Sequence, residues 1–230
     1  ATFYQGDLVF CGKQTLYRDE TFESCRLTTG KDFHQIQSND EYLYITCTKT
    51  NQIPIFADIV MAIVNIVPPY INNSVKYKKN YNHINNVFYY EVEQQWYVNL
   101  NRLNNDRQRL SGYAVFDRHF TKEIARAEYG WESHGLCFID DIIHCLVGSS
   151  VMVDSRYHPN VGGLFVNSEL VWQHNDNWFC KDFSVTDDYI YVVGTTKTIR
   201  ANRKHADGVL FVLDRKNYTL LDWYVSEGQG

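Results

Sequence analysis

The chain has 230 residues, of which 44% are hydrophobic, and a formal net charge of −5. This length and hydrophobic content suit one domain with a sizeable core. No tract of Lys and Arg forms a basic face, which argues against a nucleic acid as the partner. The 17 Tyr, 13 Phe and 5 Trp residues favour strands over long helices, because aromatic side chains fit the pleated surface of a sheet.

The sequence predicts a soluble protein of a reducing compartment. The six cysteines are far apart and show no C-x-x-C pair, so we expect buried thiols and a cytoplasmic protein. Secretion is the alternative, because N-x-S/T triplets occur at Asn72 and Asn217. No basic segment followed by an apolar core opens the chain, so we expect no signal peptide. The apolar stretch from Ile53 to Ile71 contains the Pro68-Pro69 pair and predicts two buried strands and no membrane span.

One phrase of the sequence recurs with a period of about 50 residues, which is within the range of propeller repeats. Each copy has a polar anchor, a short apolar stretch, an acidic turn and then an alternating aromatic and aliphatic strand. A faint copy opens the chain, and a clear one leads from Asp32 through Glu41 into Tyr42-Leu43-Tyr44. The copies lie at residues 1–12, 32–46, 82–98, 133–148 and 181–194.

These repeats predict an all-β fold, because a single four-stranded sheet cannot bury both of its faces whereas radially packed sheets bury one another. We predict one β-propeller domain of about five blades, each with up to four antiparallel strands. The blades are expected at residues 1–31, 32–80, 81–131, 132–179 and 180–230. Six blades is the alternative count, should the natural polypeptide continue beyond Gly230.

The anchors are the candidate functional residues, because the innermost strands of a propeller line its central channel. In the register of the repeats, one ring around the axis contains His34, His83, His134 and Lys181. Asp32, Asn82, Asn85 and Asp182 stand beside them. The sequence therefore predicts a polar funnel with several nitrogen donors directed at one volume.

Three interpretations of this ring stay open. The three histidines suit one divalent transition metal, Zn, Fe, Mn or Cu, with an open position for water or substrate. Alternatively, each histidine hydrogen-bonds the backbone of the next blade and serves packing only. In a third interpretation the ring and Lys181 donate to a carboxylate or phosphate without a metal. A metal site predicts Lys181 turned aside, and an anion site predicts it turned inward.

The phrases at residues 32–36, 83–87 and 133–136, each followed by an acidic turn and an aromatic strand, resemble the blades of gluconolactonase-like and NHL propellers. They resemble still more an uncharacterised group of bacterial propellers with His at the start of successive inner strands. The gluconolactonase-like enzymes hold an axial divalent cation with Glu, Asn and Asp, a set that is not found at the matching positions here. The virginiamycin-lyase-like propellers use a histidine and a divalent metal, so the resemblance implies a metal-assisted lyase.

Two hypotheses for the function follow. The first is a metal-dependent enzyme of lyase, hydrolase or oxygenase type for a small polar or anionic molecule, with a general acid or base supplied by Lys181, Asp182 or a loop carboxylate. Its substrate-binding residues would be Asn85, Arg200 and Arg203, the last two in a basic loop between strands. The second is a non-catalytic propeller that binds a protein or glycan partner, with structural histidines.

Other polar residues are predicted to be structural. Asp140-Asp141 and Asp187-Asp188 occupy the turn of their repeats, where Asp favours tight turns by bonding its own backbone. His144 follows one such turn and is expected to be solvated, as are three histidines in polar stretches, His158, His174 and His205.

Overall fold

The computed structural model is all-β. It describes residues 2–12, 15–18, 24–26, 32–39, 41–57, 59–66, 82–103, 110–131, 133–147, 152–153, 156–157, 163–167, 169–174, 178–198, 202 and 205–228. The chain forms two compact units. Unit 1 contains residues 1–105 and 111–128, and unit 2 contains residues 106–110 and 129–230.

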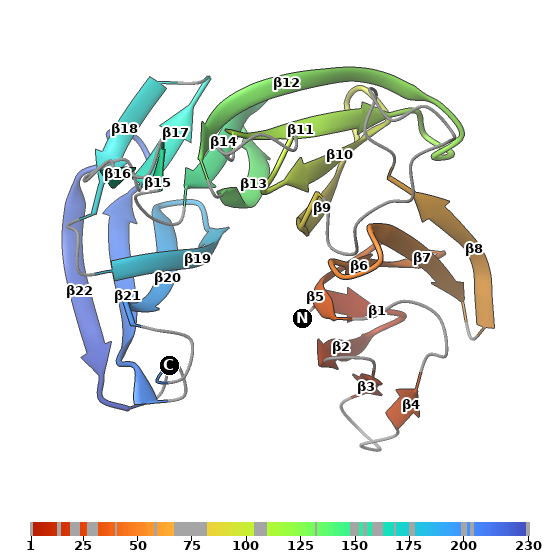
Figure 1. Ribbon diagram of the computed structural model, residues 1–230, viewed down its shortest axis with the longest axis horizontal. Helices are drawn as coiled ribbons and strands as arrows, with labels where there is room; N and C mark the ends of the chain where they lie inside the picture. Colours follow the sequence, from red (N-terminus) through yellow and green to blue (C-terminus); the bar gives the residue numbers. More distant parts are fainter. Residues whose placement is uncertain are drawn as a thin grey trace. The chain divides into compact units, whose positions relative to one another are not determined.

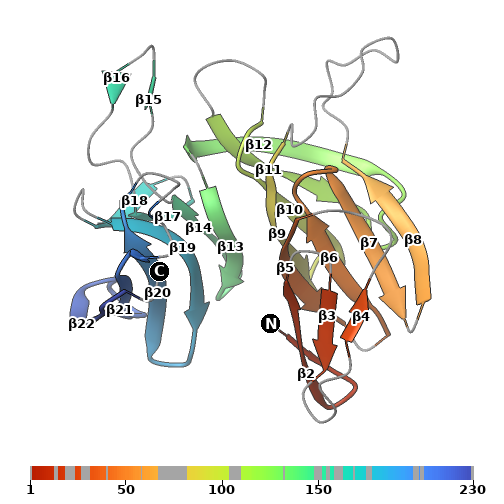
Figure 2. The same ribbon diagram turned by 60° about the horizontal axis from the view of Figure 1, so that its bottom comes forward.

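Unit 1 holds three four-stranded antiparallel sheets that follow one another along the chain (Figures 1 and 2). The first contains β1 (Thr2–Tyr4), β2 (Asp7–Gly12), β3 (Thr15–Arg18) and β4 (Ser24–Arg26). The second contains β5 (Phe33–Ser38), β6 (Leu43–Cys47), β7 (Gln52–Ala57) and β8 (Ile59–Asn65). The third contains β9 (Ile84–Tyr90), β10 (Gln95–Leu100), β11 (Leu110–Phe116) and β12 (Glu123–Trp131). The first residue of β11 and the last three of β12 are counted with unit 2.

Unit 2 holds two further four-stranded antiparallel sheets and a short two-stranded one. The first contains β13 (Ser133–Ile139), β14 (Ile142–Val147), β17 (Gly163–Val166) and β18 (Glu169–Gln173). The strands β15 (Met152–Val153) and β16 (Arg156–Tyr157) pair with each other between β14 and β17 in the chain. The last sheet contains β19 (Trp178–Val185), β20 (Tyr189–Thr196), β21 (Gly208–Asp214) and β22 (Leu220–Ser226).

Five successive four-stranded antiparallel sheets are the blades of a β-propeller, so the predicted fold class is confirmed. The acidic turns also lie where the repeats place them. Asp140 and Asp141 form the β13–β14 turn with φ of 50° and 60°, a left-handed conformation that Asp tolerates better than most residues. Asp187 and Asp188 lie between β19 and β20.

Each unit buries apolar side chains between its own sheets. In unit 1, one cluster gathers around Trp96 and Ile53, and a second gathers around Ile36 and Ile45. In unit 2, the core contains Trp178, Ile190 and other side chains of β14, β17 and β19–β21. These contacts fix the inner strands, because one face of each sheet packs against the next.

The predicted strands in the apolar stretch after residue 52 are confirmed as β7 and β8, while residues 67–71 lie outside the described part of the chain. Among the residues that the structure describes, no helix is long and apolar enough to span a membrane.

Candidate functional site

In the described strands, four of the five blades carry a β-bulge near the start of their innermost strand. A bulge inserts a residue that has no counterpart on the neighbouring strand, and it redirects side chains, often next to functional sites. The inserted positions are His34 or Gln35 in β5, Asn85 in β9, His134 in β13 and Lys181 in β19. Four predicted site residues therefore share one structural position in their blades.

The bulges change one member of the predicted ring. His83 lies just before β9, whereas Asn85 is the residue of that blade at the bulge. The alignment of the repeats had placed His83 there, two residues before the bulge. In the third blade, Asn85 is thus the counterpart of His134 and Lys181.

His34 and His83 nevertheless lie together in unit 1. Their ring centroids are 5.2 Å apart and their planes cross at 75°, an edge-to-face arrangement. His34 is exposed and His83 is half-buried. The backbone at His83 has a φ of 49°, and its carbonyl accepts the N–H of Asn101 at 3.3 Å. This left-handed residue turns the chain into β9 beside β5.

A side-chain network ties β5 to β9 beneath the two histidines. Oε1 of Gln35 accepts the backbone N–H of Val87 at 2.9 Å. The hydroxyl of Thr46 accepts the N–H of Gln35 at 2.9 Å and lies 3.2 Å from its carbonyl, so it replaces ladder hydrogen bonds that the bulge removes. These bonds explain why the first residues of β5 and β9 stay side by side.

Buried amides support the same end of unit 1. The N–H of Asn82 donates to Oδ1 of Asn51 at 2.9 Å, and its Nδ2 donates to the carbonyl of Ile66 at 3.0 Å. The carbonyl of Asn82 accepts the N–H of Arg102 at 2.9 Å. Among the described residues of this unit, six asparagines are buried: Asn51, Asn82, Asn85, Asn86, Asn99 and Asn101. We refer to these six residues as the asparagine band.

In unit 2, the rings of His134 and Phe179 make a T-shaped contact, with centroids 4.9 Å apart and planes at 75°. Lys181 and Asp182 are both exposed residues of β19. The Asp182 carboxylate accepts the N–H of Phe183 at 2.9 Å and lies beside Gly135. The Asp182 residue as a whole is exposed, but its carboxyl group is buried. This burial raises the pKa of the carboxyl group above its ordinary value. A role of Lys181 and Asp182 in acid–base catalysis stays a prediction.

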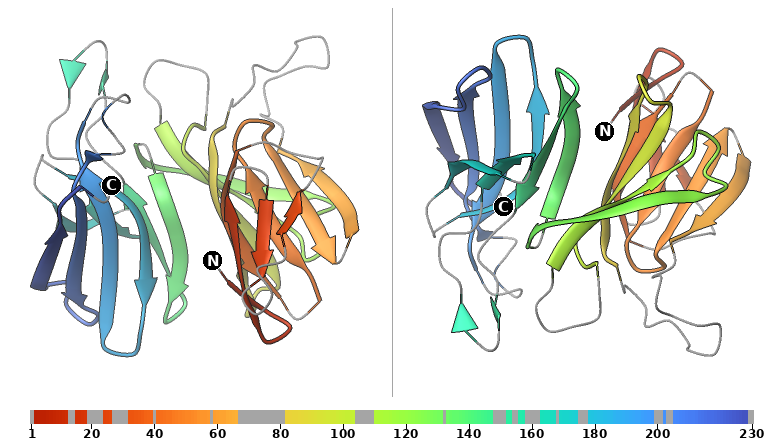
Figure 3. Two further views of the ribbon diagram at one scale, coloured as in Figure 1. Left: turned by 90° about the horizontal axis from the view of Figure 1, so that it is seen from below. Right: turned by 90° about the horizontal axis from the view of Figure 1, so that it is seen from above.

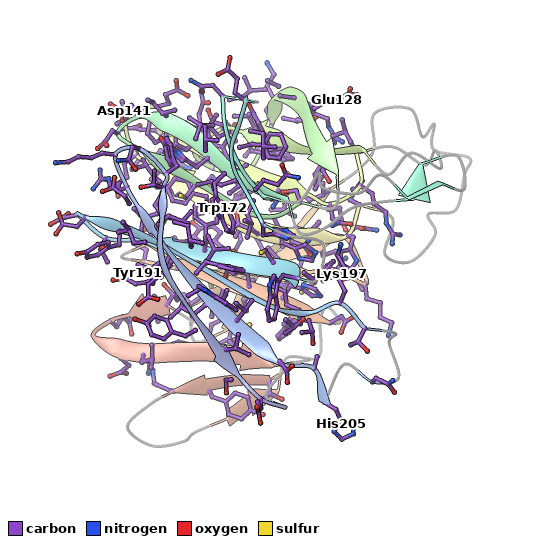
Figure 4. The ribbon with its side chains drawn as sticks, turned by 90° about the vertical axis from the view of Figure 1, so that its left-hand side faces the viewer. Glu128, Asp141, Trp172, Tyr191, Lys197 and His205 are labelled. Carbon is purple, nitrogen blue, oxygen red and sulfur yellow. The ribbon has the colours of Figure 1, made fainter. Side chains whose placement is uncertain are left out.

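The remaining predicted site residues are not brought to these histidines by the described structure. Arg200 and Arg203 lie outside the described residues. Lys197 and His205, at the ends of the basic stretch, are exposed, and Figure 4 shows His205 at a tip well away from Trp172. Within the described ranges, no group of three or more His, Cys, Asp and Glu side chains is arranged to hold a metal ion.

A pocket of about 440 Å³ lies at the opposite end of the inner strands of unit 1. Its walls come from the β1–β2 turn, the end of β5 and the end of β9, so all three blades of the unit contribute. It is lined by Tyr4, Gln5, Gly6, Gln37, Ser38, Asn39, Tyr89 and Glu91. Sequence analysis had not identified this site.

Hydrogen bonds fix the walls of the pocket. The Tyr4 hydroxyl donates to the carbonyl of Glu41 at 3.0 Å and accepts Nε2 of Gln5 at 3.2 Å. Oδ1 of Asn39 accepts the N–H groups of Glu41 and Tyr42 at 3.1 and 2.8 Å. These bonds use the polar atoms of Tyr4 and Asn39 inside the protein and hold both side chains in place.

Two side chains of the pocket keep polar atoms for a ligand. Nε2 of Gln37 makes one long bond, 3.4 Å to the carbonyl of Ser38, and within the described residues its Oε1 and the Glu91 carboxylate have no hydrogen-bond partner. Tyr89 is half-buried and adds an aromatic ring. Among the described residues, the lining therefore combines amides, hydroxyls and tyrosines with one carboxylate and has no cationic side chain.

His144 is a buried histidine, so the prediction that it is solvated was wrong. Its Nδ1 lies 2.8 Å from the carbonyl of Ile142 and its Nε2 lies 3.0 Å from the Tyr218 hydroxyl. Burial lowers its pKa, which favours the neutral ring with Nδ1–H as the donor. His174 is buried as well, beside Trp172 at a centroid distance of 6.0 Å, whereas His205 is exposed as predicted.

No family model matches the chain, and no curated protein sequence does. Solved structures match over most of its length. A protein of unknown function from Bacteroides caccae has a TM-score of 0.60 at 7% identity and covers 95% of this chain and 72% of its own. The Pan2 WD40 domain of Neurospora crassa has a TM-score of 0.54 at 11% identity, over 90% of this chain and 58% of its own.

A functionally unknown protein from Desulfotomaculum acetoxidans has a TM-score of 0.51 at 13% identity, over 93% of this chain and 76% of its own. At such low identity these likenesses concern the fold alone. The likeness to a WD40 domain agrees with the blade architecture described above.

Proposed function

We propose that this propeller is a binding module whose unit 1 pocket takes a small, neutral, polyhydroxylated ligand of the saccharide class. The observation that carries the proposal is the lining of the pocket by amide, hydroxyl and tyrosine side chains with a single carboxylate. Ligand pockets commonly have volumes of about 300–1,000 Å³, and this one has about 440 Å³.

The chemistry of the lining favours a neutral ligand over an anion. An amide such as Gln37 offers both a donor and an acceptor, which matches a pair of neighbouring hydroxyl groups. Tyr89 offers an aromatic face against which the C–H groups of a sugar ring can pack. Glu91 accepts hydrogen bonds from hydroxyls but repels carboxylates and phosphates. The anionic substrate expected from the sequence has no cationic partner among the residues that line this pocket.

We expect the Gln37→Leu variant to lose about 5- to 150-fold in affinity, because the leucine leaves ligand hydroxyls without partners, at a cost of about 1–3 kcal/mol. The probe is an array of neutral oligosaccharides, followed by calorimetric titration of the saccharide that binds. Glu91→Gln keeps the hydrogen-bonding shape and removes the charge, so it should permit binding of acidic sugars that the wild type rejects.

The matched control is Gln52→Leu. Gln52 is a half-buried glutamine of β7 in the same unit, bonded to Asn65 at 3.0 Å and outside the pocket lining. This variant should bind as the wild type does. An array without any bound saccharide, or equal affinities of the Gln37 and Gln52 variants, would refute the proposal.

A second candidate function is binding of a divalent transition metal by His34 and His83 of unit 1. The third ligand expected from the sequence, His134, stays a prediction. The favouring observation is the separation of the first two rings, 5.2 Å between centroids. Two imidazoles on one tetrahedral ion, each bonded at about 2.1 Å, have centroids roughly 5 Å apart. Neutral imidazole suits Zn, Fe, Mn or Cu.

Elemental analysis of protein purified without chelator tests this function. We expect about one equivalent of metal in the wild type and a loss of most of it in His34→Ala and in His83→Ala. His205→Ala, at an exposed histidine elsewhere, is the control and should keep the metal. A metal-free wild type that also fails to take up added Zn²⁺ would leave the histidines a structural role.

A further inference from the structure

Strand β22 ends its sheet with an edge that is both apolar and open. It pairs with β21 on one side, and no described strand pairs with its other side. All seven of its residues are exposed. Figure 3 shows β22 in dark blue at the outer margin of its sheet.

Native proteins usually protect such edges with Lys, Pro or inward-pointing charges, because free N–H and C=O groups can pair with another strand. Residues 220–226 contain neither Lys nor Pro, and Asp222 is their only charge. Trp223, Tyr224 and Val225 are 51%, 56% and 44% exposed. An edge with this composition favours pairing with a further strand.

The strand is regular from Asp222 to Ser226, since its bulge lies before this segment, between Leu220 and Asp222. Trp223 and Val225 share one face, opposite Phe211 and Val209 of β21, and Tyr224 lies on the other face. The Tyr224 hydroxyl donates to the Asp222 carboxylate at 2.6 Å. The segment therefore has an apolar face with two side chains and a polar face that is satisfied within the strand.

We propose that the partner of this edge is a second copy of the chain, paired antiparallel through β22 about a two-fold axis at Tyr224. A two-fold interface requires that residue i meet j and that j meet i. In this register Trp223 meets Val225 of the second copy, twice, which is the aromatic and β-branched pairing that stabilises sheets.

The charges fit the same register. Asp222 meets Ser226 of the second copy, so the carboxylate faces a hydroxyl and no like charges stand opposite each other. Tyr224 meets its own counterpart on the opposite face, where an aromatic pair is favourable. The segment is thus complementary to itself, which is the reason to assign a second copy as the occupant of the edge.

The first test is sedimentation velocity of the full chain from about 1 to 100 µM, a range suited to a small interface. We expect a reversible monomer–dimer equilibrium in the wild type and a monomer in Val225→Lys, because a lysine on an edge blocks pairing. The matched control is Val193→Lys, at a residue of the same sheet that is 43% exposed on the interior strand β20. This control should still dimerise.

The second test is a cross-link that does not depend on affinity. Residues directly opposite in antiparallel strands have Cα atoms about 4.5–5.5 Å apart, which is within disulfide range. Tyr224→Cys should therefore form a covalent dimer on mild oxidation, whereas Val92→Cys, in the exposed β9–β10 turn, should not.

A wild type that stays monomeric throughout this range would overturn the proposal, and so would a dimer that survives Val225→Lys while Tyr224→Cys forms no cross-link. A labelled peptide of residues 220–226 decides what replaces it. Binding of this peptide by a chain that never dimerises would assign the edge to an extended segment of another protein.

Discussion

Trp96→Ala should lower the free energy of unfolding by about 3–5 kcal/mol, the usual cost of removing a large aromatic side chain from a core. Trp96 is 1% exposed. Its ring lies 3.8 Å from Tyr44 and 5.0 Å from Phe120, centroid to centroid, and its Nε1 donates to the carbonyl of Arg118 at 3.0 Å. The substitution thus leaves a cavity between two blades of unit 1 and a carbonyl without its donor.

Urea titration followed by far-UV circular dichroism measures this loss. Val92→Ala is the control, because Val92 is 71% exposed in a turn and its truncation should change stability by no more than about 0.5 kcal/mol. Similar unfolding midpoints for Trp96→Ala and Val92→Ala would contradict the described core.

Gly163→Ala should destabilise unit 2 by about 3 kcal/mol, near the upper end of the usual cost of overpacking. A Cβ at this buried position would collide with the backbone carbonyl of Trp172, and it would lie 2.9 Å from a methyl group of Leu170 and 3.0 Å from the Cα of Gln173. The carbonyl belongs to the neighbouring strand β18, so relief requires β17 and β18 to separate.

Thermal unfolding and hydrogen exchange of the β17 and β18 amides report this effect. The matched control is Gly208→Ala on β21, where a Cβ would meet its nearest atoms at 3.8 and 3.9 Å, ordinary van der Waals distances. This control should be neutral or slightly stabilising, because alanine restricts the unfolded chain. Equal melting temperatures of the two alanine variants would show that β17 and β18 tolerate separation.

The blade hairpins were predictable from sequence because their signal is local. Alternation of apolar residues every second position identified residues 42–46, and the structure has β6 at Leu43–Cys47. The same holds for Ile142–Val147 and Tyr189–Thr196, each after its acidic turn. A strand of period two next to a tight turn specifies its own hairpin, whatever the rest of the chain does.

The register of the candidate site was only partly predictable. The sequence grouped His34 with His83, and the structure brings these two rings together. The sequence also placed His83 at the repeat position equivalent to His134. In the structure, the residue at the bulge of β9, and so at this equivalent position, is Asn85. A bulge could not be predicted from a local pattern of side chains, because it arises from pairing with the neighbouring strand.

The pocket of unit 1 could not be predicted from the sequence. Gln5, Gln37 and Glu91 come from three blades, and no motif links them. Packing of the blades alone brings them together. The signal that was available, polar residues at the ends of successive inner strands, occurs in most turns and does not distinguish a binding site from a solvated loop.

The asparagine band makes unit 1 sensitive to deamidation, a chemical change that is separate from the packing of its core. Spontaneous deamidation replaces an amide with a carboxylate, and at Asn82, which is fully buried, the new charge would sit where a donor now meets the carbonyl of Ile66. A buried charge without a partner costs several kcal/mol, or about as much as the margin by which a domain stays folded. Stored protein would therefore lose unit 1 by slow hydrolysis of single asparagine side chains. The tight burial of the asparagine band also slows this reaction.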